Sequence, residues 1–156
     1  MTAADMGALI GRIAGEVGLE PALIQAVVHA ESGGDPWAIR YEPAFHDRYV
    51  KGKIPGISAT EEIARSTSWG LMQVMGQVAR ERGFQGKYLS ALCDPETGLR
   101  IGALHLKRFL DQYGDVSKAV ASYNAGSPRM ADGRFVNQGY VDKVMAEYRR
   151  LKDGMA

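Results

Sequence analysis

Residues 21–34 read PALIQAVVHAESGG, and this stretch shows the pattern from which the fold follows. Its large apolar side chains recur at the three- and four-residue spacing of one helix face, and they are Leu23, Ile24, Val27 and Val28. Pro21 suits a first helical position, and the glycines at 33–34 suit a helix end. The stretch is therefore predicted to be an amphipathic helix whose last turn carries Glu31.

Segments with the same helical spacing occupy most of the chain on either side of this stretch. They run from Thr2 to Gly18, over Val78–Arg82, from Asp94 to Gly114, from Asp115 to Gly126 and over Val141–Leu151. Thr2, Asp94 and Asp115 suit helix caps, and glycine follows several of the segments. Hardly any segment alternates apolar and polar residues, so the predicted fold class is all-α.

The stretch at 37–68 lacks this periodicity. A structureless loop of that length is uncommon inside a domain, so we expect short helices near residues 42–50 and 59–65. A short apolar run suits one small hairpin near residues 67–75, so the fold is α+β at most by that hairpin. We therefore predict a single domain over residues 1–156 with an insertion at about 37–68.

Length and composition limit the classes of function. The chain has 156 residues, of which 46% are hydrophobic and 24% charged, as in an ordinary globular domain. Its 19 basic and 18 acidic residues leave a formal charge of +1, which excludes a whole-molecule field that would draw it to nucleic acid or an anionic membrane. Cys93 is the sole cysteine, so no disulfide within the chain can form. Neither a signal peptide nor a membrane-spanning run is predicted.

Glu31 lies seven residues after Ile24 and four after Val27, which places its carboxyl group on the apolar stripe of that helix. Burial and the negative end of the helix dipole both disfavour the ionised form, so we expect a raised pKa. A carboxyl group that keeps its proton near neutral pH can act as a general acid toward a leaving-group oxygen. The alternative is a carboxylate at the rim that reaches solvent past Gly33.

Two further segments place polar groups beside apolar ones. Tyr123 ends the apolar stripe of its own helix. If that helix packs against the one that carries Glu31, the Tyr123 hydroxyl would bond Glu31 or orient a ligand. Alternatively, the ring packs in the core and the hydroxyl stays at the surface. In the segment GLMQVMG at 70–76, Gln73 offers donors and an acceptor suited to sugar amides and hydroxyls, and Met75 offers an apolar wall. The alternative for this segment is an edge that only fills the core.

No metal site and no cofactor are predicted. The chain has three histidines, His29, His46 and His105, and their spacing is not that of metal ligands. No phosphate-binding loop, dinucleotide fingerprint or nucleophile elbow occurs in the sequence. The charged residues at 80–82 and 149–152 are interpreted as solvated helix faces.

Four separated motifs occur in a characteristic order. They are Glu31-Ser32, Gly70-Leu71-Met72-Gln73, the ASYNAG run from Ala121 to Gly126, and Tyr140-Val141. With these motifs the chain resembles the soluble lytic transglycosylase catalytic domain, a family related in fold to goose-type lysozyme, over about residues 8–150. The resemblance implies a lysozyme-like helical domain with a substrate groove. It also implies cleavage of the β-1,4 bond between N-acetylmuramic acid and N-acetylglucosamine in peptidoglycan.

The resemblance also implies a role for each matching residue. Glu31 would protonate the glycosidic oxygen and then activate the muramic C6 hydroxyl, whose attack leaves a 1,6-anhydro end. The substrate contacts it implies are Ser32, Ser68, Gln73, Met75, Tyr123, Asn124 and Tyr140. The choice of Ser68 stays open against Ser66, because the link between the Glu-Ser and Gly-Leu-Met-Gln motifs is longer here than is common in the family.

Three rival functions are weighed against this one. The long link between the Glu-Ser and Gly-Leu-Met-Gln motifs carries five acidic residues, Asp35, Glu42, Asp47, Glu61 and Glu62. A second carboxylate among them, with Glu42 the first suspect, would make the protein a hydrolytic muramidase that activates water. A non-catalytic glycan-binding module would keep the groove, but binding alone does not require an acid on an apolar stripe. A nucleic-acid module is disfavoured by the balanced charge.

The expected partner is the glycan strand of peptidoglycan, with no nucleic acid, no stable membrane insertion and a monomeric state. This substrate lies outside the cytoplasmic membrane, whereas no signal peptide is predicted. We therefore expect a protein made in the cytoplasm that acts on the cell wall or periplasm through phage lysis or as part of a phage tail. A secretion machine, or a domain excised from a longer exported protein, is the alternative route.

Overall fold

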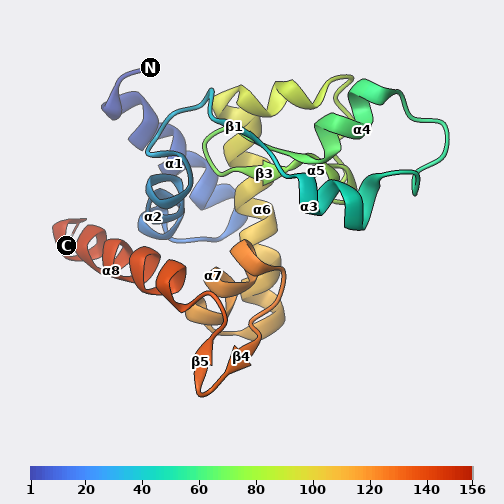
Figure 1. The fold of residues 1–156 in the computed structure, drawn as a ribbon. Coiled ribbons are helices and arrows are strands. Elements are labelled where there is room, and N and C mark those ends of the chain that lie inside the picture. The colour runs from blue at the N-terminus through green and yellow to red at the C-terminus, as the bar shows by residue number, and fades with distance from the viewer. Residues whose placement is uncertain (156) are drawn as a thin grey trace. The chain divides into compact units, whose positions relative to one another are not determined.

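The structure, a computed structural model, describes residues 1–155 and is mostly helical, which confirms the predicted fold class (Figure 1). It divides into two units. The first unit comprises Met1–Ala30 and the chain from Ala103 onward, and the second comprises Glu31–Gly102. None of the described helices is long and apolar enough to cross a membrane.

The first unit is built mainly from helices. They are α1 (Ala3–Val17), most of α2 (Pro21–Ser32), the second part of α6 (Pro95–Tyr113), α7 (Val116–Ala125) and α8 (Gln138–Met155). Helix α1 begins with a capping box formed by Thr2 and Asp5, and α7 begins at Asp115, whose side chain accepts a backbone hydrogen bond. Gly18 and Gly126 end these helices in the left-handed conformation, so the predicted boundaries are confirmed.

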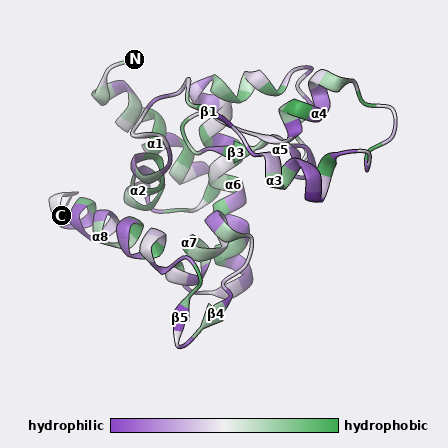
Figure 2. Ribbon diagram, viewed as in Figure 1, coloured by the Kyte–Doolittle hydropathy of each residue, from purple (hydrophilic) through white to green (hydrophobic). Residues whose placement is uncertain are grey.

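The stripe predicted on α2 is buried. Leu23, Ile24, Val27 and Val28 are each at most 2% exposed. Every other helix of the unit also contributes buried apolar side chains, among them Ile10, Ile13, Leu106, Val120 and Val144. Figure 2 shows hydrophobic and hydrophilic stretches alternating along α8, the pattern of a helix with one buried face. Burial of these stripes stabilises the unit.

A two-stranded hairpin that the sequence did not reveal follows α7. Its strands, β4 (Met130–Ala131) and β5 (Arg134–Phe135), pair antiparallel around Asp132 and Gly133. These two residues have φ of 51° and 74°, as in a type I′ turn, which an Asp-Gly pair favours. The strands are too short for a period-two pattern to identify them.

The second unit contains a three-stranded antiparallel sheet in the order β1-β2-β3. Its strands are β1 (Ile39–Tyr41), β2 (Thr67–Trp69) and β3 (Val74–Met75). The pairing of β2 with β3 confirms the predicted hairpin, and β1 adds a strand from inside the insertion. The register places Ser68 opposite Arg40 on one side and opposite Met75 on the other.

Short helices complete the second unit. They are α3 (Pro43–Phe45), the π-helical turn η1 (His46–Val50), α4 (Ala59–Arg65), α5 (Gly76–Glu81), the 3-10 helix η2 (Leu89–Cys93) and the first part of α6. The helices expected near 42–50 and 59–65 are therefore confirmed. Ser58 begins α4 by accepting the Glu61 N–H, which is ordinary N-cap geometry.

Candidate active site

The last turn of α2 carries Glu31 and Ser32, as the spacing predicted, and Glu31 is half-buried. The Ser32 hydroxyl donates to the Leu71 carbonyl at 2.8 Å and accepts the Gly34 N–H at 3.2 Å. This pair of bonds fastens the end of the helix to the Gly-Leu-Met-Gln segment. Two motifs far apart in the sequence are thereby joined. The raised pKa expected for Glu31 stays a prediction.

Strands β2 and β3 bring three of the expected site residues together. Ser68 and Met75 are register partners, and the Ser68 hydroxyl lies 3.0 Å from the Gln73 side-chain oxygen. The Gln73 amide nitrogen donates to the carbonyls of Ala38 and Gly70 at 2.9 and 3.0 Å. Both amide protons therefore brace the turn, and the oxygen retains one lone pair for a ligand. Gln73 has fewer free donors than the sequence suggested.

The two serines left open by the resemblance lie in different surroundings. Ser66 is fully buried at the end of α4, where its hydroxyl donates to the Glu62 carbonyl at 3.0 Å. Ser68 lies on β2, within hydrogen-bonding distance of Gln73 and of the Arg40 carbonyl. Of the two, Ser68 is the serine that belongs to the Gly-Leu-Met-Gln neighbourhood.

The remaining expected site residues lie in the first unit, at the end of α7 and the start of α8. The Asn124 side-chain oxygen accepts a hydrogen bond from the Asn137 amide at 2.9 Å, and the Tyr140 N–H donates to the Asn137 carbonyl at 3.0 Å. The Tyr123 and His105 rings lie 5.4 Å apart. Asn137 thus links the Tyr-Asn pair to Tyr140. Asn137 was not selected from the sequence. Its position just before the last predicted helix is the feature that could have drawn attention to it.

Glu61 of the insertion is held by two arginines. Arg65 lies 2.9 Å from one Glu61 oxygen, and Arg80 of α5 bonds both oxygens at 2.7 and 3.1 Å. Burial alone would raise the pKa of Glu61, but the hydrogen bonds from Arg80 and Arg65 outweigh it and lower the pKa. The interpretation of residues 80–82 as a solvated face is therefore wrong for Arg80, whose side chain is 16% exposed.

Other acidic residues between the Glu-Ser and Gly-Leu-Met-Gln motifs also have partners. Glu62 lies 2.7 Å from the His46 imidazole, and this hydrogen bond lowers the pKa of the Glu62 carboxyl. Glu42, the suspected second carboxylate, accepts a hydrogen bond from Arg40 at 2.6 Å. Asp35 accepts the backbone N–H of Trp37 at 2.9 Å. A lowered pKa, as at Glu61 and Glu62, makes a carboxylate a weaker base toward water.

Comparison with known proteins gives a consistent picture. The family model described as Transglycosylase SLT domain matches residues 8–138, a range that contains the first three motifs and stops before Tyr140. The transglycosylase of Enterobacteria phage PRD1 is 29% identical over 142 residues, which cover 91% of this chain and 42% of that protein. Invasion protein IagB of Salmonella typhi is 35% identical over 92 residues, which cover 56% of this chain and 54% of that protein.

The matched relatives are longer than this chain, which spans about half of their length. A shorter segment of 51 residues is 40% identical to alanine–tRNA ligase of Mycobacterium avium, but it covers only 6% of that protein. The family model covers most of the chain, so it outweighs this short match.

Proposed function

The chain belongs to the Transglycosylase SLT domain family, and from this premise we propose that it is a peptidoglycan lytic transglycosylase. Its substrate is the β-1,4 bond between N-acetylmuramic acid and N-acetylglucosamine. The observation that carries the proposal is Glu31 at the end of the apolar stripe of α2, with Ser32 bonded to the Gly-Leu-Met-Gln segment. A half-buried carboxyl group at the negative end of a helix is suited to hold a proton.

The proposed reaction uses one carboxyl group twice. Glu31 gives its proton to the glycosidic oxygen while the bond from that oxygen to the muramic C1 breaks, so N-acetylglucosamine leaves with a free O4 hydroxyl. The resulting carboxylate takes the proton of the muramic C6 hydroxyl, whose oxygen forms the new bond to C1. Glu31 is protonated again, no water is consumed, and the product carries a 1,6-anhydro ring.

We assign the substrate contacts to two sets of residues. In the second unit they are Ser32, Ser68, Gln73 and Met75, and in the first unit they are Tyr123, Asn124 and Tyr140. The Ser68–Gln73 bond and the Asn137–Asn124 bond support this assignment, because side chains held in one conformation lose little entropy when a ligand binds. No metal ion or cofactor takes part in this scheme.

Hydrolysis by a second carboxylate is the rival. A muramidase of that kind needs a base or nucleophile opposite the acid. Glu61 and Glu62 are engaged by basic side chains with lowered pKa values, and Glu42 is bonded to Arg40. These contacts favour the internal attack over the activation of water.

The proposed place of action is the cell wall, reached in a phage context, and the proposed state is a monomer. The similarity to a phage transglycosylase supports the phage context.

We expect Glu31→Gln to lose activity on purified peptidoglycan by about 10²- to 10⁴-fold, the usual contribution of a general acid or base. The substitution keeps the shape of the side chain and removes the proton donor. Glu42→Gln is the matched control and is expected to keep the parent rate within about twofold, since the proposed scheme needs no second carboxylate.

Mass spectrometry of the digests tests the outcome of the reaction. The parent protein should release muropeptides with 1,6-anhydromuramic ends. Reducing muramic ends, together with a loss of activity in Glu42→Gln, would establish the hydrolytic rival instead. A Glu31→Gln variant that lyses cell walls as fast as the parent would contradict the assigned acid.

A further inference from the structure

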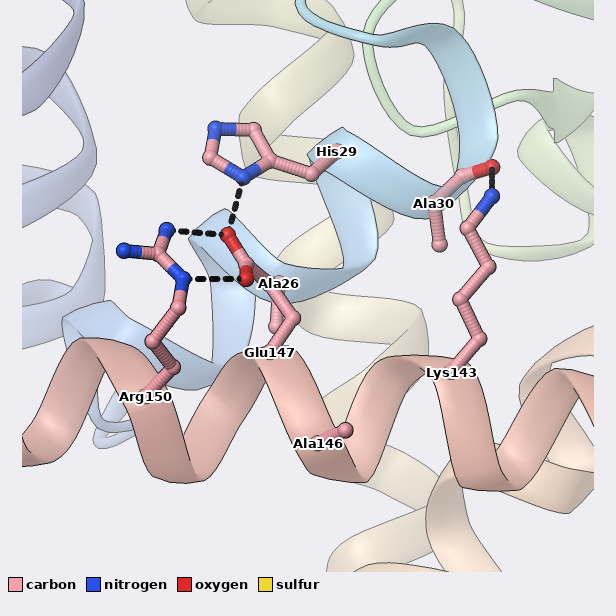
Figure 3. A pocket seen from close by; sticks show the side chains of 7 residues that line it. All are labelled: Ala26, His29, Ala30, Lys143, Ala146, Glu147 and Arg150. Atoms are coloured by element: carbon pink, nitrogen blue, oxygen red, sulfur yellow. Dashed lines mark hydrogen bonds and ion pairs between the residues drawn. The ribbon is translucent and has the colours of Figure 1, made fainter.

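Helix α8 reaches the C-terminal end of α2 through two polar links in the first unit (Figure 3). In the first link, the His29 imidazole lies 2.6 Å from a Glu147 oxygen, and Arg150 bonds both oxygens of that carboxylate at 2.7 Å. In the second link, the Lys143 ammonium donates to the Ala30 carbonyl at 3.4 Å. We call these four side chains and the Ala30 carbonyl the α2 clamp.

The clamp borders a hollow. A cavity of about 380 Å³ lies between α2 and α8, and three of its lining residues are alanines, Ala26, Ala30 and Ala146. Alanine side chains are too short to fill the space between the two helices. Figure 3 shows the Lys143 and Glu147 side chains extending from α8 toward α2 on either side of Ala146. The polar links therefore add to the attachment that the buried Val27 and Val28 and the Ser32–Leu71 bond give this end of α2.

Each link acts on a defined group. Helix α2 ends at Ser32, so the Ala30 carbonyl is one of its last four, which have no partner inside the helix. Lys143 supplies a donor to that carbonyl, and a cation at this end also suits the helix dipole. Hydrogen bonds from Arg150 and His29 lower the pKa of Glu147 to about 2, so the carboxylate is charged near neutral pH.

We propose that Lys143 and Glu147 are positioning residues for the proposed acid Glu31. Lys143 donates to the Ala30 backbone carbonyl, one residue before Glu31, and Glu147 contacts the His29 side chain, two residues before it. The inference rests on the proposed function, because the placement of the helix end affects the rate only if Glu31 takes part in the chemistry. Small displacements of a catalytic group are costly, since a shift of about 1 Å can reduce a rate by about a hundredfold.

The chain offers a matched control at the opposite end of α2. Lys152 of α8 lies 3.2 Å from Glu20, the residue directly before Pro21. Lys152→Met removes a polar link between the same two helical regions, at the end remote from Glu31. A loss of stability alone would affect this variant and a clamp variant alike.

Steady-state kinetics on purified glycan strands test the proposal. We expect Lys143→Met and Glu147→Gln to lower kcat by about tenfold and to leave KM within about twofold, because Glu31 is displaced while all the proposed substrate contacts except Ser32 lie outside the helix end. Lys143→Arg keeps a cation and should restore most of kcat. Lys152→Met should match the parent.

Amide hydrogen exchange provides a readout that does not depend on turnover. Exchange over residues 29–34 should be at least about fivefold faster in Lys143→Met and Glu147→Gln than in the parent, because the clamp no longer limits local opening. It should be unchanged in Lys152→Met. Glu31→Gln is assayed beside these variants. If that variant is fully active, the proposed function is contradicted, and the positioning role falls with it whatever the hydrogen exchange shows.

Three results would overturn the positioning role while leaving the proposed function intact. Unchanged exchange in both clamp variants would show that the links do not hold the helix end. Faster exchange with an unchanged kcat would show that the clamp is only structural. An equal fall in kcat in Lys152→Met would show that any lost link between these helices has the same effect.

Discussion

Gly70 shows how one residue ties the candidate site to the core of its unit. Its φ is +72°, and a Cβ atom added to it would lie 2.4 Å from the Leu92 carbonyl oxygen. A backbone oxygen cannot rotate away as a flexible side chain can. A glycine is therefore needed here for two reasons. It adopts a positive φ without strain, and its missing Cβ lets the Gly-Leu-Met-Gln segment approach the backbone of η2.

Gly70→Ala is expected to reduce the free energy of unfolding by about 3 kcal/mol, from left-handed backbone strain and from overpacking. Gly33→Ala is the control, because Gly33 has a φ of +64° but no heavy atom within 4 Å of the added Cβ. It should lose only about 1 kcal/mol. Urea unfolding of both variants measures the difference, and equal losses would contradict the close approach.

Side-chain chemistry at single positions was predictable only in part. The spacing on α2 placed Glu31 correctly in the last turn, and the motif drew attention to Gln73. The sequence could not show that the Gln73 amide donates to the carbonyls of Ala38 and Gly70, because these groups meet only in the folded turn. A polar residue in a sequence has the same donors whether they face a ligand or brace a loop.

At the scale of elements, α4 and α5 are joined by the Glu61, Arg65 and Arg80 cluster. The carboxylate lies on α4, Arg80 lies on α5, and the Glu61 side chain is 18% exposed. The folded-state pKa of Glu61 is lower than its unfolded value, so the ionised form is stabilised by folding. This contribution is present above the unfolded pKa and is lost as the pH falls through the folded pKa.

Glu61→Gln is expected to destabilise the protein by about 1.5–3 kcal/mol at pH 7, the range for hydrogen bonds to charged groups. The difference in free energy of unfolding between the variant and the parent should shrink as the pH falls from the unfolded pKa of the carboxyl group through its folded pKa, because the parent carboxylate is then protonated as well. Urea unfolding at pH 7 and pH 3 tests the sign. An Asp47→Asn control removes an exposed pair with Lys51 and should change little. A pH-independent loss would exclude the ionic explanation.

Elements differed in how well the sequence revealed them. Helices were predictable where a stripe, a cap and a glycine end coincide, as in α1 and α7. The short strands β1, β4 and β5 were not, because two or three residues cannot display an alternating pattern. They form because a partner strand or a turn is brought next to them.

At the scale of the whole molecule, Cys93 is a probe of folding. It is the sole cysteine and is 6% exposed. Burial and the nearby Asp35 carboxylate raise the pKa of the thiol, so little reactive thiolate exists at neutral pH. The thiol therefore becomes reactive mainly when the surrounding structure opens.

A thiol-reactive disulfide reagent is expected to label the native protein at least about a hundredfold more slowly than the urea-unfolded chain, since exposure and ionisation both increase on unfolding. The unfolding midpoint should be the same with and without a reducing agent, because the chain cannot form an internal disulfide. Absorbance during labelling and thermal scans measure the two quantities. Complete labelling of the native protein within seconds would contradict the burial of the thiol.

Local spacing was enough to establish the helical class, most helix boundaries, the position of Glu31 and the resemblance in motif order. These features depend on residues three or four apart, or on their order along the chain. The pairing of distant polar groups followed only from packing: Glu61 with Arg80, Ser32 with the Leu71 carbonyl, and His29 with Glu147. A hydrogen bond forms over about 3 Å, so partners far apart in sequence meet only after the helices and strands have packed in one arrangement.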